Sequence, residues 1–201
     1  MSVLCKSEIL CWMENPKIEK RLIITPLINP KKCLGTSSID VRLGNQFILM
    51  KRQSFPLLDI SNPEKLINNI GRYQEKVVVK FQQQFTLHPG QLVLGSTLEY
   101  VKIPSGLMCY MIGKSTWGRL GLIIATATKI DPGFTGCITL EIINEGEVPL
   151  VLYPGIPIAQ LVFHRTSEND ESLYRGKYNC PIGPQFPMLK IDSDFKFWIK
   201  K

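Results

Sequence analysis

Residues 130–163 read IDPGFTGCITLEIINEGEVPLVLYPGIPIAQLVF, which is three apolar runs separated by turn residues. Asp131-Pro132-Gly133 opens the stretch, and Gly146 and Pro154-Gly155 fall between the runs. Short strands that recur every roughly 8–12 residues with turn signals between them are typical of a β-sandwich, jelly roll or barrel. This stretch therefore predicts a mainly β fold.

The rest of the chain repeats the same pattern. We expect further strands in residues 21–27, 37–50, 75–81, 85–90, 91–104, 107–115 and 120–130. A short helix is expected over residues 7–14, with Ser7 as its N-cap and Pro16 just beyond its end. Residues 59–71 read as a loop with one helical turn. The prediction is a distorted β-barrel or jelly roll with a short N-terminal helix.

The C-terminal part has a different composition. Residues 167–188 are polar and rich in Gly and Pro, with Pro181, Pro184 and Pro187 close together. Such a segment is either disordered or closes over something. We therefore expect one domain over residues 1–201, with residues 165–201 as its tail or lid.

Composition limits the possible partners and compartments. The net charge of +7 favours an anionic ligand, but the basic residues are dispersed and no aromatic-rich RNA-binding motif accompanies them. Uncharged stretches are too short to cross a bilayer, and no secretion signal opens the chain. We expect a cytoplasmic protein that binds neither membranes nor nucleic acid. Its six cysteines form no CxxC pair, so reduced and mostly buried thiols are expected.

Several catalytic chemistries lack their sequence motifs. The chain has only two histidines and contains no HExxH, Walker A, GxGxxG or GxSxG motif. The HxE…PCxxC signature of zinc deaminases is absent as well. We expect no metal held by protein ligands.

Two stretches can still carry chemistry. GKSTWGRLGL, residues 113–122, places Lys114, Ser115 and Arg119 in a glycine-flanked loop, which suits a phosphate but is equally a tight surface turn with two ordinary cations. In the run CITLEII, alternation puts Glu141 on the face of Cys137 and Thr139, opposite the apolar face. A solvent-exposed Glu on a half-buried strand fits that alternation at least as well as a functional carboxylate.

Ordered motifs extend this pattern along most of the chain. They are SSIDVRLGNQF (37–47), FTLHPGQLVLGSTLEYVKIP (85–104), GKSTWGRLGL (113–122), IDPGFTGCITLEI (130–142), PLVLYPGIPIAQLVF (149–163) and RGKYN (175–179). Together they resemble the dCTP deaminase branch of the dUTPase-like trimeric superfamily. The resemblance implies a dUTPase-like homotrimer with sites between subunits. It implies zinc-independent hydrolysis of dCTP to dUTP and ammonia, in support of dTTP synthesis.

The resemblance also implies roles for individual residues. Glu141 would shuttle protons between the attacking water, N3 and the leaving amine, while Ser115 and Arg119 would hold that water and the developing charge. The other nucleotide contacts would come from Lys114, Thr116, Trp117, Gly118, Asp131, Phe134, Thr139, Leu140, Gln160, Tyr174, Lys177 and Tyr178. Mg²⁺ would arrive on the triphosphate, and dTTP would be an inhibitor.

Some residues depart from the family pattern and leave alternatives open. Trp117 replaces a smaller apolar residue, TATK (126–129) matches neither branch of the family, and Pro181 falls near an expected phosphate-binding Gln that Gln185 would have to replace. The chain could convert dCTP to dUMP and pyrophosphate. It could also be a dUTPase, although Phe134 stands where that family has Tyr. A third alternative is a nucleotide-sensing or nucleotide-depleting defence protein.

Overall fold

The computed structural model describes residues 2–51, 57–59, 62–125, 129–167 and 173–188. The helices are α1 (Lys6–Met13), η1 (Ile18–Lys20), α2 (Pro30–Cys33), α3 (Pro63–Tyr73) and α4 (Ser115–Gly118). The strands are β1 (Ile23–Thr25), β2 (Ile39–Arg42), β3 (Gln46–Met50), β4 (Gln74–Val78), β5 (Phe85–Leu87), β6 (Leu92–Lys102), β7 (Leu107–Gly113), β8 (Leu122–Ile124), β9 (Lys129–Ile130), β10 (Thr135–Asn144), β11 (Leu150–Leu152) and β12 (Pro157–Arg165).

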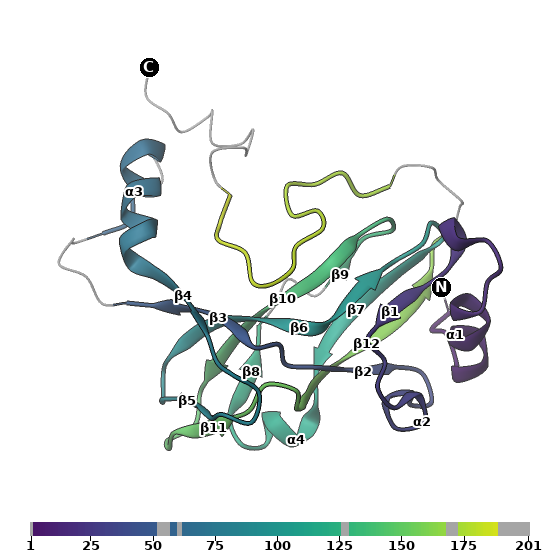
Figure 1. Ribbon diagram of the computed structural model, residues 1–201, viewed down its shortest axis with the longest axis horizontal. Coiled ribbons are helices and arrows are strands. Elements are labelled where there is room, and N and C mark those ends of the chain that lie inside the picture. Colours follow the sequence, from purple (N-terminus) through teal and green to yellow (C-terminus); the bar gives the residue numbers. More distant parts are fainter. Residues whose placement is uncertain (1, 52–56, 60–61, 126–128, 168–172, 189–201) are drawn as a thin grey trace.

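The strands form antiparallel sheets that pack against one another (Figure 1). The larger sheet has the order β4-β3-β6-β10-β8, and β1 also pairs with β6. A second sheet has the order β2-β12-β7-β9, and β5 pairs with β11. The predicted mainly β fold is confirmed, although the strands of the described residues make separate sheets and do not close into a barrel.

The core lies between the sheets and follows from the alternation of the strands. Leu140 and Ile142 of β10 are fully buried, as are Leu161 and Phe163 of β12. Alternate residues of each strand point to opposite faces, so one face of each sheet supplies this core. Described residues include no helix long and apolar enough to span a membrane.

The helices differ from the sequence expectations. The N-terminal helix is confirmed, but Ser7 is not its N-cap: the helix begins at Lys6, and Glu8 accepts a hydrogen bond from the backbone N–H of Cys5 at 3.1 Å. The prediction of a loop over residues 59–71 is wrong, because α3 occupies most of this stretch. Its Asn62 caps α3 by accepting from the backbone N–H of Lys65 at 3.1 Å, and Pro63 occupies the first helical turn, where no N–H is needed.

Two of the predicted strands are each divided into two shorter strands. Residues 37–50 form β2 and β3, separated where Gly44 approaches Ser96 so closely that a Cβ would lie 2.9 Å from its hydroxyl oxygen. Residues 120–130 give β8 and β9, with 126–128 outside the described residues.

Only Cys109 and Cys137 are buried, so the expectation of mostly buried thiols is wrong.

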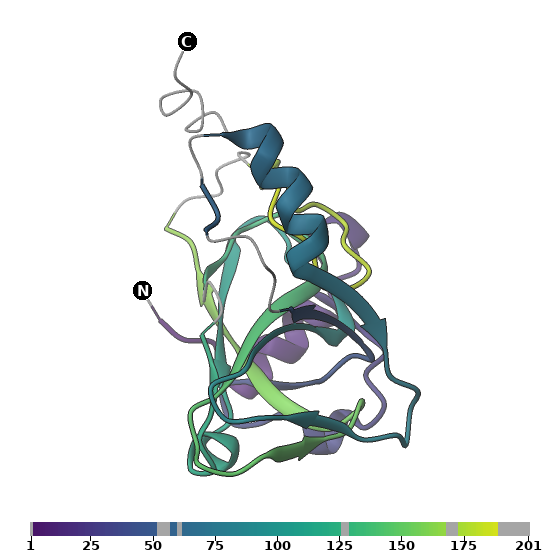
Figure 2. The same ribbon diagram turned by 90° about the vertical axis from the view of Figure 1, so that its left-hand side faces the viewer.

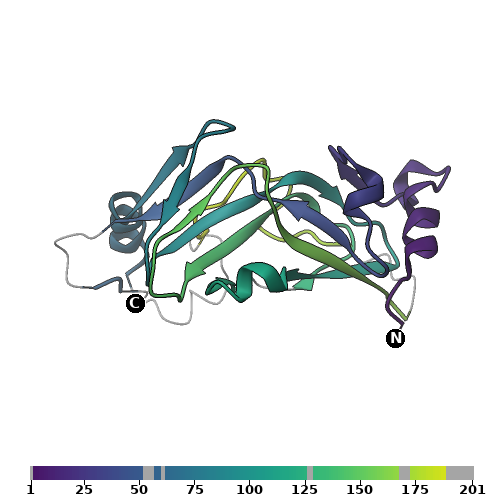
Figure 3. The ribbon, with the colours of Figure 1, turned by 90° about the horizontal axis from the view of Figure 1, so that it is seen from below.

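The overall layout separates the two candidate stretches. α1 and α3 lie at opposite ends of the molecule, as Figures 1 and 3 both show. Figures 1 and 2 place α4 at the foot of the molecule and residues 173–188 near its top. The glycine-flanked loop and the C-terminal segment therefore occupy different sides of the fold.

Candidate active site

A cavity of about 420 Å³ lies on the outer face of the larger sheet, beneath the C-terminal segment. This volume suits a small-molecule ligand. Its wall comes from four parts of the chain: β3 and β4, β6, the β9–β10 turn with β10, and the tail. The residues used below are Met50, Gln74, Leu92, Leu94, Asp131, Phe134, Cys137, Thr139, Glu141, Tyr174, Tyr178, Pro181 and Gln185.

Glu141 projects into this cavity from β10. It is partly buried, while its neighbours Leu140 and Ile142 are fully buried on the core side, so the predicted alternation is confirmed for residues 139–142. Its cross-strand partner is Leu94, which places the carboxylate beside an apolar wall. The backbone carbonyl of Glu141 accepts from Ala125 N–H at 2.9 Å. The strand thus holds the carboxylate against a partly dry surface.

One irregularity in β10 changes which residues reach the cavity. The register with β6 shifts between Cys137 and Thr139, and Ile138 also lines the cavity in consequence. Burial raises the pKa of the Cys137 thiol, with a smaller effect from the Glu99 carboxylate. A thiol with a raised pKa remains protonated at neutral pH and is a poor nucleophile. The carboxylate of Glu141 is therefore the better candidate for chemistry here.

The β9–β10 turn forms one end of the cavity. Gly133 has a φ of +86°, which the turn requires and which an L side chain rarely adopts. Asp131 pairs with Lys129 at 2.7 Å between Oδ1 and Nζ. A hydrogen bond to Asp131 raises the pKa of the Lys129 ammonium. Phe134 meets Tyr174 of the tail edge-on, with ring centroids 5.8 Å apart.

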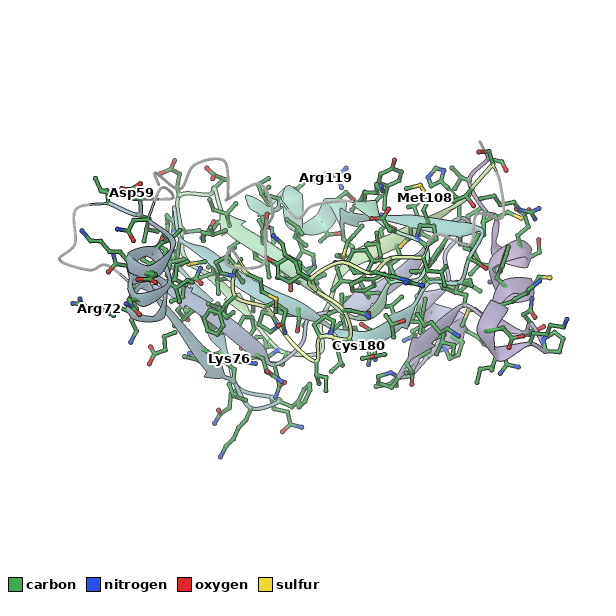
Figure 4. The ribbon with its side chains drawn as sticks, turned by 90° about the horizontal axis from the view of Figure 1, so that it is seen from above. Asp59, Arg72, Lys76, Met108, Arg119 and Cys180 are labelled. Atoms are coloured by element: carbon green, nitrogen blue, oxygen red, sulfur yellow. The ribbon has the colours of Figure 1, made fainter. Side chains whose placement is uncertain are left out.

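The tail is attached to β10 by backbone hydrogen bonds. Thr135 C=O accepts from Cys180 N–H at 2.8 Å, and Cys137 N–H donates to Pro181 C=O at 2.7 Å. Farther along, Gln185 N–H donates to Thr139 Oγ1 at 3.3 Å. Figure 4 looks down on this face, with Cys180 labelled over the sheet. The described part of the tail covers the cavity of its own chain.

Gly136 makes this attachment possible. Its φ is +143°, and a Cβ at this position would lie 2.2 Å from the Pro181 ring. We expect Gly136→Ala to displace the tail and to speed amide hydrogen exchange at Cys180 about tenfold or more, because its hydrogen bond to Thr135 is lost.

The matched control for this variant is Gly71→Ala. Gly71 lies in α3 with open space where a Cβ would stand, so this change is expected to leave exchange at Cys180 unaltered. Unchanged exchange at Cys180 in Gly136→Ala would contradict the tail attachment described above.

Several predicted site residues meet in the cavity: Asp131, Phe134, Thr139, Glu141, Tyr174 and Tyr178. Lys177 places its Nζ 5.5 Å from the Tyr178 ring centroid, beside the cavity wall. The side chain of Leu140 faces the core, so only its backbone can reach a ligand.

The glycine-flanked loop does not reach this cavity within one chain. Its residues Ser115, Thr116, Gly118 and Arg119 are exposed, and none of them lines the cavity. Lys114 pairs with Asp40, and Trp117 Nε1 donates to Pro157 C=O at 2.8 Å. Figure 4 labels Arg119 at the border of the molecule, apart from Cys180. The predicted catalytic group of Glu141, Ser115 and Arg119 is therefore not assembled by a single copy.

Gln160 lies on the outer face of the second sheet. Its Oε1 accepts from Ser38 Oγ at 3.0 Å, and its strand neighbour across β2 is Asp40, the partner of Lys114. Gln160 and Lys114 thus share one polar surface, away from the cavity that holds Glu141.

Sequence reasoning missed one end of the cavity. Met50 and Gln74, on β3 and β4, line it together with Leu92 and Leu94 of β6. The position of Gln74 depends on α3, which directly precedes it and was expected to be a loop. The only sequence signal for Met50 and Gln74 is the alternation of β3 and β4, which places their side chains on the outward-facing side of the sheet. Described residues contain no cluster of three His, Cys, Asp or Glu side chains that could hold a metal ion.

Comparison with known proteins identifies the family. Residues 5–166 match the family model described as dCTP deaminase-like. The chain belongs to the dCTP deaminase-like family. The resemblance seen in the ordered motifs is thereby confirmed.

Curated relatives support this assignment. A "dCTP deaminase, dUMP-forming" of Dictyoglomus turgidum is 39% identical over 181 residues, which cover 87% of this chain and 90% of the relative. A "dCTP deaminase" of Hamiltonella defensa is 40% identical over 196 residues, covering 95% and 99%. Both forms of the deaminase therefore resemble this chain to a similar degree.

A solved structure shares the fold. The 2'-deoxycytidine 5'-triphosphate deaminase of Agrobacterium tumefaciens aligns with a TM-score of 0.58 at 23% identity. The alignment covers 80% of this chain and 46% of that one, so this chain spans under half the length of the solved protein. At this identity the likeness concerns the fold alone.

Proposed function

We propose that this protein converts dCTP to dUMP, pyrophosphate and ammonia by two hydrolytic steps at one site. The observation that carries the proposal is the cavity beneath the tail, which holds Glu141 and Asp131 together. Two carboxylates can serve two hydrolyses, one at C4 of the base and one at the α-phosphate. The dUMP-forming relative of Dictyoglomus turgidum, 39% identical, supports a second step after deamination.

In the first step, Glu141 removes a proton from the water that attacks C4 of cytosine. It then returns protons to N3 and to the departing amine, which leaves as ammonia. The position of Glu141 in the cavity, on a rigid strand beside Leu94, supports this role. A carboxylate placed in this way contributes about 10²–10⁴ to the rate.

The second step hydrolyses the bond between the α- and β-phosphates. Asp131 would orient the attacking water, with the sugar stacked near Phe134 and Tyr174. Mg²⁺ would arrive on the triphosphate as part of the substrate and would neutralise its charge. Lys177 and Tyr178 of the tail would cover the phosphates.

We further propose that residues 114–119 of a second copy complete the site. In one chain this loop lies away from Glu141, and its exposed Ser115 and Arg119 are free to face a neighbouring subunit. The open face of the second sheet exposes Tyr110 and Ile112 by 38% and 42%, an apolar surface that a second copy would bury. These features support an oligomer with sites between subunits, and we propose that it is a homotrimer. Inhibition by dTTP stays a prediction.

A single incubation tests the function. The protein with dCTP and Mg²⁺ is expected to yield dUMP and pyrophosphate in equal amounts, with no accumulation of dUTP, when the nucleotides are separated by chromatography. Accumulation of dUTP would identify a deaminase that stops after the first step. Unchanged dCTP would overturn the proposal, and hydrolysis of added dUTP alone would identify a dUTPase.

Asp131→Asn separates the two steps. The amide keeps the size of the side chain but cannot orient water as a carboxylate does, so dUTP is expected to replace dUMP as the main product. Deamination at Glu141 is expected to continue within about tenfold of the wild-type rate. Asp59→Asn, an exposed residue outside the cavity, serves as the matched variant and is expected to keep forming dUMP. Continued dUMP formation by Asp131→Asn would remove Asp131 from the second step.

A further inference from the structure

Gln74 carries a buried acceptor that the fold does not satisfy. Among the described residues, its Oε1 is the only buried side-chain oxygen or nitrogen without a hydrogen-bond partner. Its Nε2 donates to Met50 Sδ at 3.2 Å, and both side chains line the cavity that holds Glu141. Leaving a buried acceptor unpaired costs free energy, so such a group calls for an explanation.

The orientation of the amide follows from its neighbour. A thioether sulfur can only accept hydrogen bonds, so the NH₂ group of Gln74 belongs on the Met50 side. Oε1 is then the atom left for a partner from elsewhere. That partner has to be a hydrogen-bond donor.

The strand register places Gln74 at the end of the cavity beyond Glu141. Glu141 pairs with Leu94, and the next residue pair along β10 in the same orientation joins Ile143 to Leu92. β3 and β10 both run antiparallel to β6, so they are parallel to each other. Leu94 pairs with Ile48 on β3, which puts Met50 and its partner Gln74 level with Ile143.

The cavity therefore has a defined order along β10. Asp131 and Phe134 precede the strand, and Glu141 lies near its far end. Gln74 lies one residue pair past Glu141 along the strand direction, on β4, three strands across the sheet from β10. If the sugar lies at Asp131 and C4 at Glu141, as the proposed function requires, a base that leans across β6 turns the substituent on C4 toward the end of the cavity that Gln74 lines. In cytosine this substituent is an amino group, which donates hydrogen bonds, and in uracil it is a carbonyl, which only accepts them.

We propose that Gln74 recognises the 4-amino group of the cytosine ring and gives the site its preference for cytosine over uracil nucleotides. Oε1 accepts one N–H of the amine, while Met50 holds the amide in the orientation that this contact needs. The inference rests on the proposed function. It adds a specificity-determining residue from β4, a strand outside the family motifs quoted above. After deamination, the product carbonyl faces Oε1 without a proton between them, which favours movement of the base away from Gln74.

The test measures binding of dCTP and dUTP by calorimetry in a Glu141→Gln background, where dCTP is not consumed. Gln74→Leu is expected to weaken dCTP binding about tenfold and to change dUTP binding by less than about twofold. Gln74→Met supplies a second apolar variant with a flexible side chain. Both are expected to keep or raise the melting temperature, since each removes an unpaired buried acceptor; a merely structural Gln74 would instead lower it.

Gln91→Leu is the matched control. Its Oε1 accepts from His88 N–H at 3.0 Å, and the side chain lies outside this cavity, so the variant is expected to lose stability without changing the dCTP to dUTP preference. Equal weakening of both nucleotides, or unchanged dCTP binding, in the Gln74 variants would overturn the inference. Failure of the wild-type protein to convert dCTP is a different result, and it would overturn the proposed function itself.

Discussion

Replacing Glu141 by Gln is expected to leave dCTP binding within about tenfold of wild type while removing nearly all deamination, a loss of at least about 10²–10⁴ in rate. The amide matches the carboxylate in size and can still hydrogen-bond. It cannot take a proton from water or return one to the base. Release of ammonia and calorimetric binding of dCTP measure the two effects separately.

Glu145→Gln is the control for this change. Glu145 is exposed in the turn after β10, outside the cavity, so its variant is expected to deaminate dCTP at the wild-type rate. Deamination by Glu141→Gln at a similar rate would show that another group moves the proton.

The second large effect concerns mixtures of two inactive proteins. Glu141→Gln and Arg119→Ala are each expected to be inactive, because each removes one half of every site. If each site takes Glu141 from one subunit and residues 114–119 from its neighbour, random exchange of equal amounts creates intact sites. At each site, the subunit that supplies position 141 carries Glu with a probability of about one half, and the neighbour that supplies position 119 carries Arg with the same probability. About a quarter of the sites are then intact, so about a quarter of wild-type activity is expected to return.

This experiment needs proof that subunits have exchanged. Tags of two sizes on the two variants, followed by native mass spectrometry, supply that proof. The control mixes Glu141→Gln with the double variant Glu141→Gln/Arg119→Ala, which has no intact Glu141 to contribute and is expected to stay inactive. Mixed oligomers without recovered activity in the main experiment would mean that the loop and Glu141 act within the same chain.

Local pattern predicted the parts of the site that lie along one strand. Alternation placed Glu141 opposite Leu140 and Ile142, and Asp131-Pro132-Gly133 was predicted as the turn before this strand. These features depend on residues adjacent in sequence, where the two-residue period of a strand decides which side chains share a face.

The parts that depend on distant packing were not predictable. α3 was missed because Asn62-Pro63 also reads as a turn, and the end of the cavity at Gln74 was missed with it. The separation of Arg119 from Glu141 depends on how β7, β8 and α4 fold around the core. No spacing in the sequence indicates whether two motifs meet within one chain or between copies.

The attachment of the tail to β10 also bears on solubility. Backbone N–H and C=O groups at the edge of a sheet, where no partner strand bonds to them, are sites at which chains associate and aggregate. Thr135 C=O and Cys137 N–H would be such groups if Cys180 and Pro181 did not bond to them. A chain cut after Arg165 would uncover them beside apolar cavity residues such as Leu94 and Phe134. The segment that covers the cavity thus also protects the larger sheet from its neighbours in solution.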